Sequence, residues 1–305
     1  MEKVTFNGWE NSIRFANGQV ELIVVTAVGP RIARFAFEGE RNLFAELPGQ
    51  QGGRGEPKWM IRGGHRFWIA PEEMPKTYEL DNEPVPYRRI AGGVRTLQPP
   101  GRFSGVSKTM DITLATDRNE VKIVHTLTNC RKRTVRLAPW ALTAMAQGGL
   151  AIIPLPKKIP HTERLTHNQE WSLWGYTDLS DPRWTLGSRY IFFRQNRKRG
   201  PNKIGIAHRE GWVAYQLGEF VFVKRFDRKE GATYPDGGVN FETFSNEDFL
   251  ELESLGPLVD LPAGKSVQHV ERWELYREIP RCRTEDDVDR HILPLVEKRM
   301  CCCQA

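Results

Sequence analysis

Glu251 and Glu253 stand two residues apart in the alternating run Leu-Glu-Leu-Glu at residues 250–253. In a β-strand, side chains at i and i+2 point to the same face, so both carboxylates share one face while Leu250 and Leu252 face the core. Two carboxylates this close repel each other, which raises one pKa towards the range of a general acid or base. The pattern predicts a carboxylate pair for acid–base chemistry, or else a solvated strand face that carries two glutamates.

A second segment, residues 62–72, joins cationic donors to a flat aromatic ring. Arg62, His65 and Arg66 supply hydrogen-bond donors beside Trp68, and two glycines between them let the backbone turn sharply or approach a ligand. Sugars are bound by this combination, because an aromatic ring covers their C–H face while charged groups take the hydroxyls. We predict that these three residues bind or polarise a sugar; a strand that buries its aromatic residues in the core is the alternative.

The third segment, residues 171–184, is an aromatic-rich stretch that is expected to form a loop. It holds three tryptophans, one tyrosine and two aspartates, and loops often carry binding residues. Trp174 and Tyr176 are predicted to stack on a sugar, and Asp178 or Arg183 to take its hydroxyls. The alternative is a loop that packs over one end of the fold.

Several other chemistries are excluded by their motifs. Residues 264–266 read Gly-Lys-Ser, but Val259 stands where a phosphate loop needs its leading glycine, and the segment is typical of a turn. His161 and His167 have proline-rich, irregular flanks that indicate exposed loop residues rather than metal ligands. The tail Cys301–Cys303 is expected to be reactive rather than metal-binding. We predict no metal and no cofactor.

The elements that must position these residues are short strands. Period-two alternation, broken by turn residues about every ten positions, runs through most of the chain. The clearest runs are residues 12–16, 19–25, 31–37, 62–71, 94–97, 109–115, 120–128, 134–143, 189–193, 203–207, 212–215, 219–224, 249–254 and 266–275. One helix is expected near the end, capped by Thr284 and kinked or shortened by Pro294. Many strands without intervening helices predict an all-β antiparallel sandwich, residues 1–280, followed by a helical tail, residues 281–305.

Charge and hydropathy limit the partners. The chain has 305 residues, with 44 Lys and Arg against 38 Asp and Glu, and a net charge of +6. Its basic clusters at residues 131–133 and 194–199 lie between strand-like runs and are interpreted as hairpin tips, with no nucleic-acid-binding signature beside them. No apolar run is long enough for a membrane span or a secretion signal. We therefore expect a cytoplasmic protein that binds neither nucleic acid nor membrane, and whose net charge suits an acidic or phosphorylated sugar.

Together these segments resemble the galactose mutarotase-like superfamily, which includes aldose 1-epimerases and hexose-6-phosphate mutarotases. The Arg-Gly-Gly of residues 62–64, followed by Pro71, is similar to a strand of the sugar-phosphate mutarotases. Residues 125–140 are similar to the central hairpin of the superfamily, and residues 250–264 to its C-terminal end. The resemblance spans residues 10–277 and implies a super-sandwich of two large antiparallel sheets with a sugar cleft on the concave face.

In these enzymes a glutamate is the base at the anomeric hydroxyl and a histidine donates to the ring oxygen. The resemblance implies that Glu253, or otherwise Glu251, is this glutamate, with Glu251 tuning it. No histidine stands at the family position within residues 139–143, so His65 from the neighbouring strand is the catalytic candidate for the acid, with His161 or His167 from the loop as the alternatives. The expected function is carbohydrate binding with aldose 1-epimerase-type activity. A non-catalytic sugar-binding or regulatory module, and a lyase or hydrolase on the same scaffold, are the alternatives.

Overall fold

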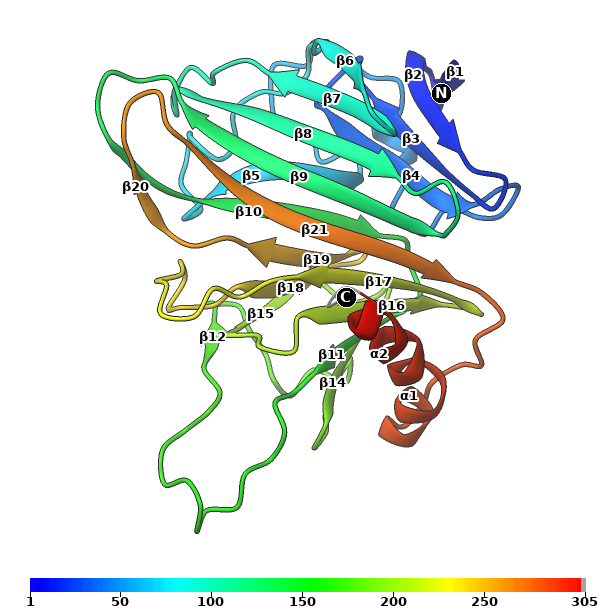
Figure 1. Cartoon of the computed structure of the whole chain (residues 1–305), viewed down its shortest axis with the longest axis vertical. Helices are drawn as coiled ribbons and strands as arrows, with labels where there is room; N and C mark the ends of the chain where they lie inside the picture. Colours follow the sequence, from blue (N-terminus) through cyan, green and yellow to red (C-terminus); the bar gives the residue numbers. More distant parts are fainter. Residues whose placement is uncertain (303–305) are drawn as a thin grey trace.

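The structure, a computed structural model that describes residues 1–302, consists of two antiparallel β-sheets and a helical tail (Figure 1). The larger sheet has eleven strands. Its spatial order is β1 (Glu2–Phe6), β2 (Trp9–Ala16), β3 (Val20–Val25), β4 (Arg31–Phe37), β5 (Gly64–Ala70), β10 (Val135–Met145), β19 (Leu250–Leu255), β18 (Phe241–Ser245), β15 (Asn202–Ile206) and β12 (Trp171–Leu173), with β20 (Val259–Leu261) paired to β10.

The smaller sheet has ten strands. Its order is β13 (Trp184–Leu186), β14 (Tyr190–Arg194), β11 (Leu150–Pro154), β16 (Trp212–Leu217), β17 (Phe220–Phe226), β21 (Ser266–Tyr276), β9 (Glu120–Asn129), β8 (Val106–Leu114), β7 (Gly93–Gln98) and β6 (Tyr87–Ile90). A 3-10 turn, η1 (Pro48–Gln50), lies in the long loop between β4 and β5. The predicted all-β antiparallel sandwich is confirmed.

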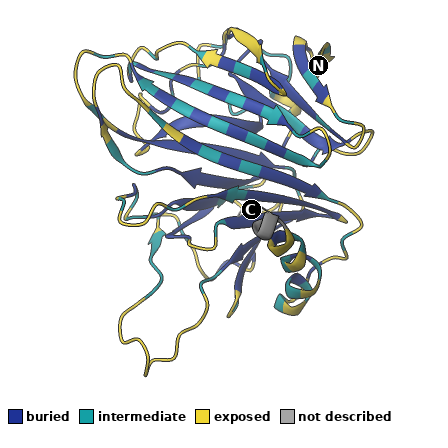
Figure 2. Cartoon of the chain, viewed as in Figure 1, coloured by how far each residue is buried: buried dark blue, intermediate teal, exposed yellow. Residues whose placement is uncertain are grey.

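Alternating side chains build the core between the two sheets. On β8 and β9 every second residue is buried, and Figure 2 shows the resulting alternation of buried and half-buried positions. Aromatic side chains fill the centre: Phe44 meets Phe222 and Trp273 edge to face, with ring centroids 5.6 and 5.5 Å apart. The first hairpin turns at Asn17 and Gly18 as predicted, because Gly18 has a φ of +84°.

Two helices, α1 (Glu285–His291) and α2 (Leu293–Cys302), form the tail. Thr284 caps α1 through a capping box with Asp287, as the sequence indicates. The predicted break is real: Ile292 ends α1, and Pro294 follows in the first turn of α2. Val288, Ile292 and Val296 pack with apolar residues of β11, β14, β16 and β17, so the tail covers part of the smaller sheet.

Two sequence-based interpretations are wrong. The basic segments at residues 131–133 and 194–199 are not hairpin tips, because β9 and β10, and likewise β14 and β15, belong to different sheets. Residues 171–184 are not wholly loop, since β12 begins this segment and β13 starts at its end. Cys303 lies outside the described residues, and so do the side chains of Cys301 and Cys302. No helix within residues 1–302 is both long and apolar enough to cross a membrane.

Candidate functional site

The predicted glutamates lie on the outer face of the larger sheet. Leu250 and Leu252 of β19 belong to the core between the sheets, so Glu251 and Glu253 point away from it, as the alternation predicts. The strand register pairs Glu253 with Glu242 of the neighbouring strand β18. This face is not solvated: Glu251 and Glu253 are only 5% and 1% exposed.

A lysine lies between the two paired glutamates. The Lys203 Nζ, from β15, is 2.6 Å from Glu242 Oε2 and 3.1 Å from Glu253 Oε2. The Trp140 Nε1 also donates to Glu253 Oε2, at 3.1 Å. Glu253 Oε1 and Glu242 Oε1 have no hydrogen-bond partner within residues 1–302 although both atoms are buried. Buried acceptors of this kind are usually paired, so a ligand that donates hydrogen bonds would complete the cluster.

Burial and the single ammonium set the protonation of this cluster. Burial raises the pKa of Glu242 well above its ordinary value, and Lys203 opposes the rise only in part. Burial also raises the pKa of Glu253. Burial alone would lower the pKa of Lys203, but the charges of Glu253 and Glu242 raise it, so the ammonium stays charged. One cation faces two carboxyl groups whose pKa values are both raised by burial, so the protonated form of the pair is favoured relative to that of ordinary glutamates.

A second ion pair and a set of aromatic rings surround the carboxylates. Arg66 Nη1 lies 2.5 Å from Glu251 Oε1, and its guanidinium stacks 4.3 Å from the Trp68 ring and 5.4 Å from the Trp59 ring. On the other side, Lys203 Nζ lies 4.9 Å from the Trp140 ring and 4.6 Å from the Trp174 ring. The face therefore combines carboxylates, cations and flat apolar surfaces, the combination used to bind sugars.

Residues 174–177 form a turn that covers this face. The ring of Trp174 packs over Gly205, where an added Cβ would come within 3.1 Å of it. Thr177 holds the turn by donating its hydroxyl to the Lys203 carbonyl at 2.5 Å, and the Trp174 N–H donates to the same hydroxyl. Tyr176 is 46% exposed, and burial of its ring raises the pKa of its hydroxyl to about 12.

Three predicted binding residues lie outside the carboxylate cluster, where they form hydrogen bonds that stabilise loops. Arg62 donates to Glu56, Asn82 and two carbonyls of the β4–β5 loop. Asp178 accepts from the backbone and hydroxyl of Ser180. Arg183 pairs with Asp181 at 2.9 Å and donates to the Gly200 carbonyl. The structure thus brings Arg66, Glu251, Glu253, Trp174 and Tyr176 together but leaves Arg62, Asp178 and Arg183 outside.

His65 lies on the opposite face of β5, in the core between the sheets. Its Nδ1 is 2.8 Å from Thr143 Oγ1, and its Nε2 is 2.8 Å from His125 Nε2 of the smaller sheet. The His125 Nδ1 donates to the His269 carbonyl at 3.2 Å, so His125 Nε2 accepts from His65, which in turn accepts from Thr143. His65 is fully buried and does not reach the carboxylate face.

The neighbours of His65 include a potential metal-ligand set, His65, His125 and Glu271. Its geometry fits a hydrogen-bonded network better than a metal site. The two imidazole nitrogens are 2.8 Å apart, whereas two ligands of one tetrahedral zinc are about 3.3 Å apart. The ammonium of Lys224 already lies 2.9 Å from Glu271 Oε1, and the Trp273 Nε1 donates to Glu271 Oε2. The Lys224 ammonium thus supplies the positive charge beside the Glu271 carboxylate that a metal ion would otherwise supply.

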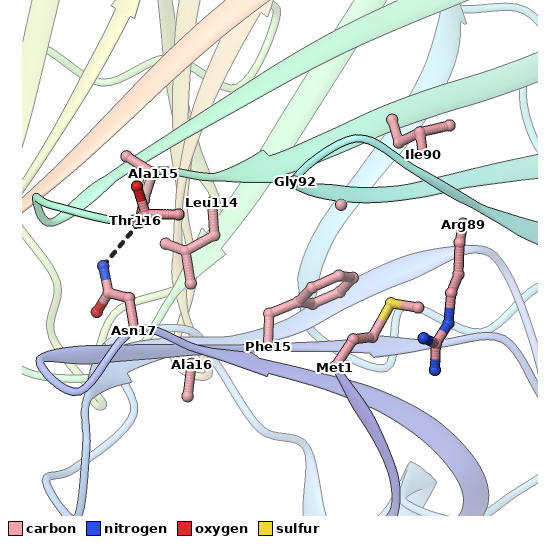
Figure 3. A pocket seen from close by; sticks show the side chains of 11 residues that line it. Met1, Phe15, Ala16, Asn17, Arg89, Ile90, Gly92, Leu114, Ala115 and Thr116 are labelled. Carbon is pink, nitrogen blue, oxygen red and sulfur yellow. Dashed lines mark hydrogen bonds between the residues drawn. The ribbon is translucent and has the colours of Figure 1, made fainter.

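A cavity of about 290 Å³ lies away from both clusters, between the first strands and the β7–β8 edge (Figure 3). Its lining includes Arg89, Phe15 and Leu114, together with Asn17, whose Nδ2 donates to the Ala115 carbonyl at 2.8 Å. None of the lining residues carries a carboxylate, thiol or imidazole. This cavity offers no acid–base chemistry.

Sequence reasoning missed Lys203, Glu242 and Trp140 as members of the cluster. Lys203 and Glu242 stand in strand-like runs, where a charged residue at an alternating position signals a buried partner, whereas Trp140 carries no charge and gives no such signal. The signal does not identify that partner. The pairing of β15 with β18 and of β18 with β19 brings Lys203 to Glu253 across 50 positions of the chain, and the pairing of β10 with β19 brings Trp140 to Glu253 across 113.

We compared the chain with family models, with curated protein sequences and with solved structures. No protein-family model and no curated protein sequence matches the chain. Among solved structures, a galactose mutarotase-like protein from Lactobacillus casei matches at a TM-score of 0.59 and 10% identity, over 87% of this chain and 100% of the other. A galactose mutarotase related enzyme from Lactobacillus acidophilus matches at 0.56 and 8%, over 90% and 100%. A provisionally assigned aldose 1-epimerase from Escherichia coli K12 matches at 0.51 and 12%, over 87% and 99%. By its architecture, the chain has the galactose mutarotase-like fold.

Proposed function

We propose that the outer face of the larger sheet binds a sugar, and that Glu253 acts there as the base of an aldose 1-epimerase-type reaction. One observation carries the proposal: the buried oxygens Glu253 Oε1 and Glu242 Oε1 have no hydrogen-bond partner within the described chain and lie among aromatic rings. A sugar supplies the two things this surface lacks, hydroxyl donors for the oxygens and a C–H face for the rings.

The two carboxyl groups suit the two proton transfers of mutarotation. Glu253 takes the proton of the anomeric hydroxyl while the bond between anomeric carbon and ring oxygen breaks, and Glu242 gives its proton to the ring oxygen. Rotation of the open-chain aldehyde and reversal of both transfers close the ring as the other anomer. Glu242 suits the acid role because burial raises its pKa. It takes the place proposed from the sequence for His65, which faces the core.

The remaining residues position the ligand in this proposal. Arg66 holds Glu251 in a salt bridge, and the half-buried Trp174 and the exposed Tyr176 offer stacking surfaces. Both cations of the face are paired with carboxylates, so a neutral sugar fits it better than a sugar phosphate. Because Glu253 is only 1% exposed, the sugar reaches it when the turn at residues 174–177 moves aside.

Anomer exchange measured by saturation-transfer NMR tests the proposal, with a panel of glucose, galactose, hexose 6-phosphates and uronic acids. We expect faster exchange for a neutral sugar and loss of the acceleration in Glu253→Gln. The matched control is Glu10→Gln, an exposed glutamate of β2. Unchanged exchange in Glu253→Gln contradicts the base assignment.

Non-catalytic sugar binding is the second candidate. It is favoured by Trp140, whose indole N–H and the Lys203 ammonium both contact Glu253 Oε2 and reduce its basicity. Line broadening of a sugar without faster exchange would establish this candidate. Neither effect with any sugar would contradict both.

A further inference from the structure

A second pocket, of about 350 Å³, is lined by residues of the smaller sheet and of the segment before the helical tail. It forms where the end of β14, the start of β11 and the β16–β17 turn meet the segment that leads to α1. Its lining residues are Gly148, Leu150, Arg194, Gln216, Gly218, Arg281, Cys282 and Arg283. The proposed sugar face belongs to the larger sheet, so this pocket is a separate site.

Three arginines give this pocket a concentrated positive charge. The guanidinium groups of Arg194, Arg281 and Arg283 form no ion pair and no side-chain hydrogen bond with the side chains that the structure describes, those of residues 1–298, and none of the lining residues is acidic. The nearest acidic residues of α1 accept hydrogen bonds from backbone N–H groups, and Asp287 lies beside the pocket because one of its donors is the N–H of the lining residue Arg283. Glu285 accepts from the Arg189 and Tyr190 N–H groups, and Asp287 accepts from those of Arg283 and Thr284. The lining of the pocket therefore presents three cations and no carboxylate of its own, with the Asp287 carboxylate beside it on the Arg283 backbone.

The backbone that carries these arginines is fixed in place. Gln216 Oε1 accepts from the Cys282 N–H at 2.8 Å, and Gln216 Nε2 donates to the Pro280 carbonyl at 2.9 Å. Cys282 itself is buried in the apolar cluster beneath α1. Arg281 and Arg283 thus flank an anchored residue. Gly148 and Gly218 have positive φ and open space at their Cβ positions, so a ligand can approach the backbone there.

We propose that this pocket is a binding site for a small phosphate-bearing molecule. Arginine presents planar, paired N–H donors that match phosphate oxygens. Three positively charged groups around one pocket favour an anionic ligand over a neutral one. The volume is in the range of small-molecule sites. The site also gives a role to Arg194, the first residue of the basic cluster at residues 194–199, which the sugar site does not use.

Isothermal titration calorimetry with inorganic phosphate, pyrophosphate and AMP tests the site on the full chain. We expect saturable binding of at least one of them, weakened about tenfold in each of Arg194→Gln, Arg281→Gln and Arg283→Gln, as for one lost charge-assisted hydrogen bond. Tighter binding of AMP than of both inorganic anions indicates a phosphate ester as the ligand, and the reverse order indicates a free anion.

The matched control is Arg88→Gln, an exposed arginine of β6 that has no carboxylate partner within the described residues. It removes the same charge from the other edge of the smaller sheet, so its affinity should equal that of the unmodified protein. If the control and the three pocket variants lose the same affinity, the loss comes from the change in net charge alone, and the proposal is overturned. Absence of saturable binding for all three probes would overturn it as well. Circular dichroism confirms that each variant is folded.

Discussion

At the residue scale, the outer face of the larger sheet depends on one ammonium shared by two buried carboxyl groups. Removing Lys203 leaves Glu242 and Glu253 without their cation. We expect Lys203→Met to lower the free energy of unfolding at neutral pH by roughly 3 to 5 kcal/mol, because a buried charge loses its partner. Urea denaturation measures the change, and Lys58→Met, at an exposed position, is the control. Equal stability of the two variants would show that the ion pairs contribute nothing.

Replacing Glu242, in contrast, should increase the free energy of unfolding. Its pKa is raised by burial, so folding favours its protonated form. The stabilisation is complete below the ordinary glutamate pKa of about 4.3 and is lost as the pH rises through the folded-state pKa. Glu242→Gln keeps a neutral side chain at every pH. It should therefore raise the free energy of unfolding by about 1 kcal/mol or more above the folded-state pKa and leave it nearly unchanged in acid. Thermal melts across this pH range check the result; a gain confined to acid would contradict it.

At the element scale, the helical tail is stable because its start is capped and one face is buried. Thr284 Oγ1 accepts from the Asp287 N–H at 3.2 Å, and Asp287 Oδ2 accepts from the Thr284 N–H. Thr284→Ala should lower the free energy of unfolding by about 1 kcal/mol, the usual effect of a lost N-cap. Thr185→Ala, an exposed threonine of β13, controls for the loss of a hydroxyl. Chemical denaturation of both variants checks the difference, and an equal effect would rule out the cap.

The elements also show what the sequence could predict. Alternation located most strands, placed Glu251 and Glu253 on one face and identified the capped helix, because these features depend on residues close together in the chain. Strand pairing depends on distant residues. For this reason the alternating pattern did not reveal that Lys203 lies between Glu242 and Glu253, or that β9 and β10 belong to different sheets. His65 was placed on the correct strand, but the pattern did not show which face it occupies.

At the scale of the whole molecule, a buried polar network joins the two sheets. It runs from Thr143 and His65 of the larger sheet to His125, His269 and Glu271 of the smaller one. Ser254 donates to Glu271 Oε1 at 2.5 Å and lies 2.6 Å from His269 Nε2. Because the network crosses the core, its protonation state acts on the packing of one sheet against the other.

This network predicts acid sensitivity of the whole fold. Burial lowers the pKa of His125 to about 3 and that of His269 to about 4, and it lowers the pKa of His65 well below its ordinary value. The unfolded chain takes up protons on these histidines near pH 6.5, whereas the folded chain does not, so their stability contribution is complete above about pH 6.5 and falls with the pH towards about pH 4. Over this range each histidine therefore lowers the free energy of unfolding by up to about 1.4 kcal/mol for each unit by which the pH falls.

Urea denaturation at several pH values measures this effect. The free energy of unfolding should fall steeply with the pH in the unmodified protein and less steeply in His125→Gln. Replacing the exposed His161 and His167 by Asn should leave the slope unchanged. A flat profile for the unmodified protein would mean that the network accepts protons without opening the sandwich.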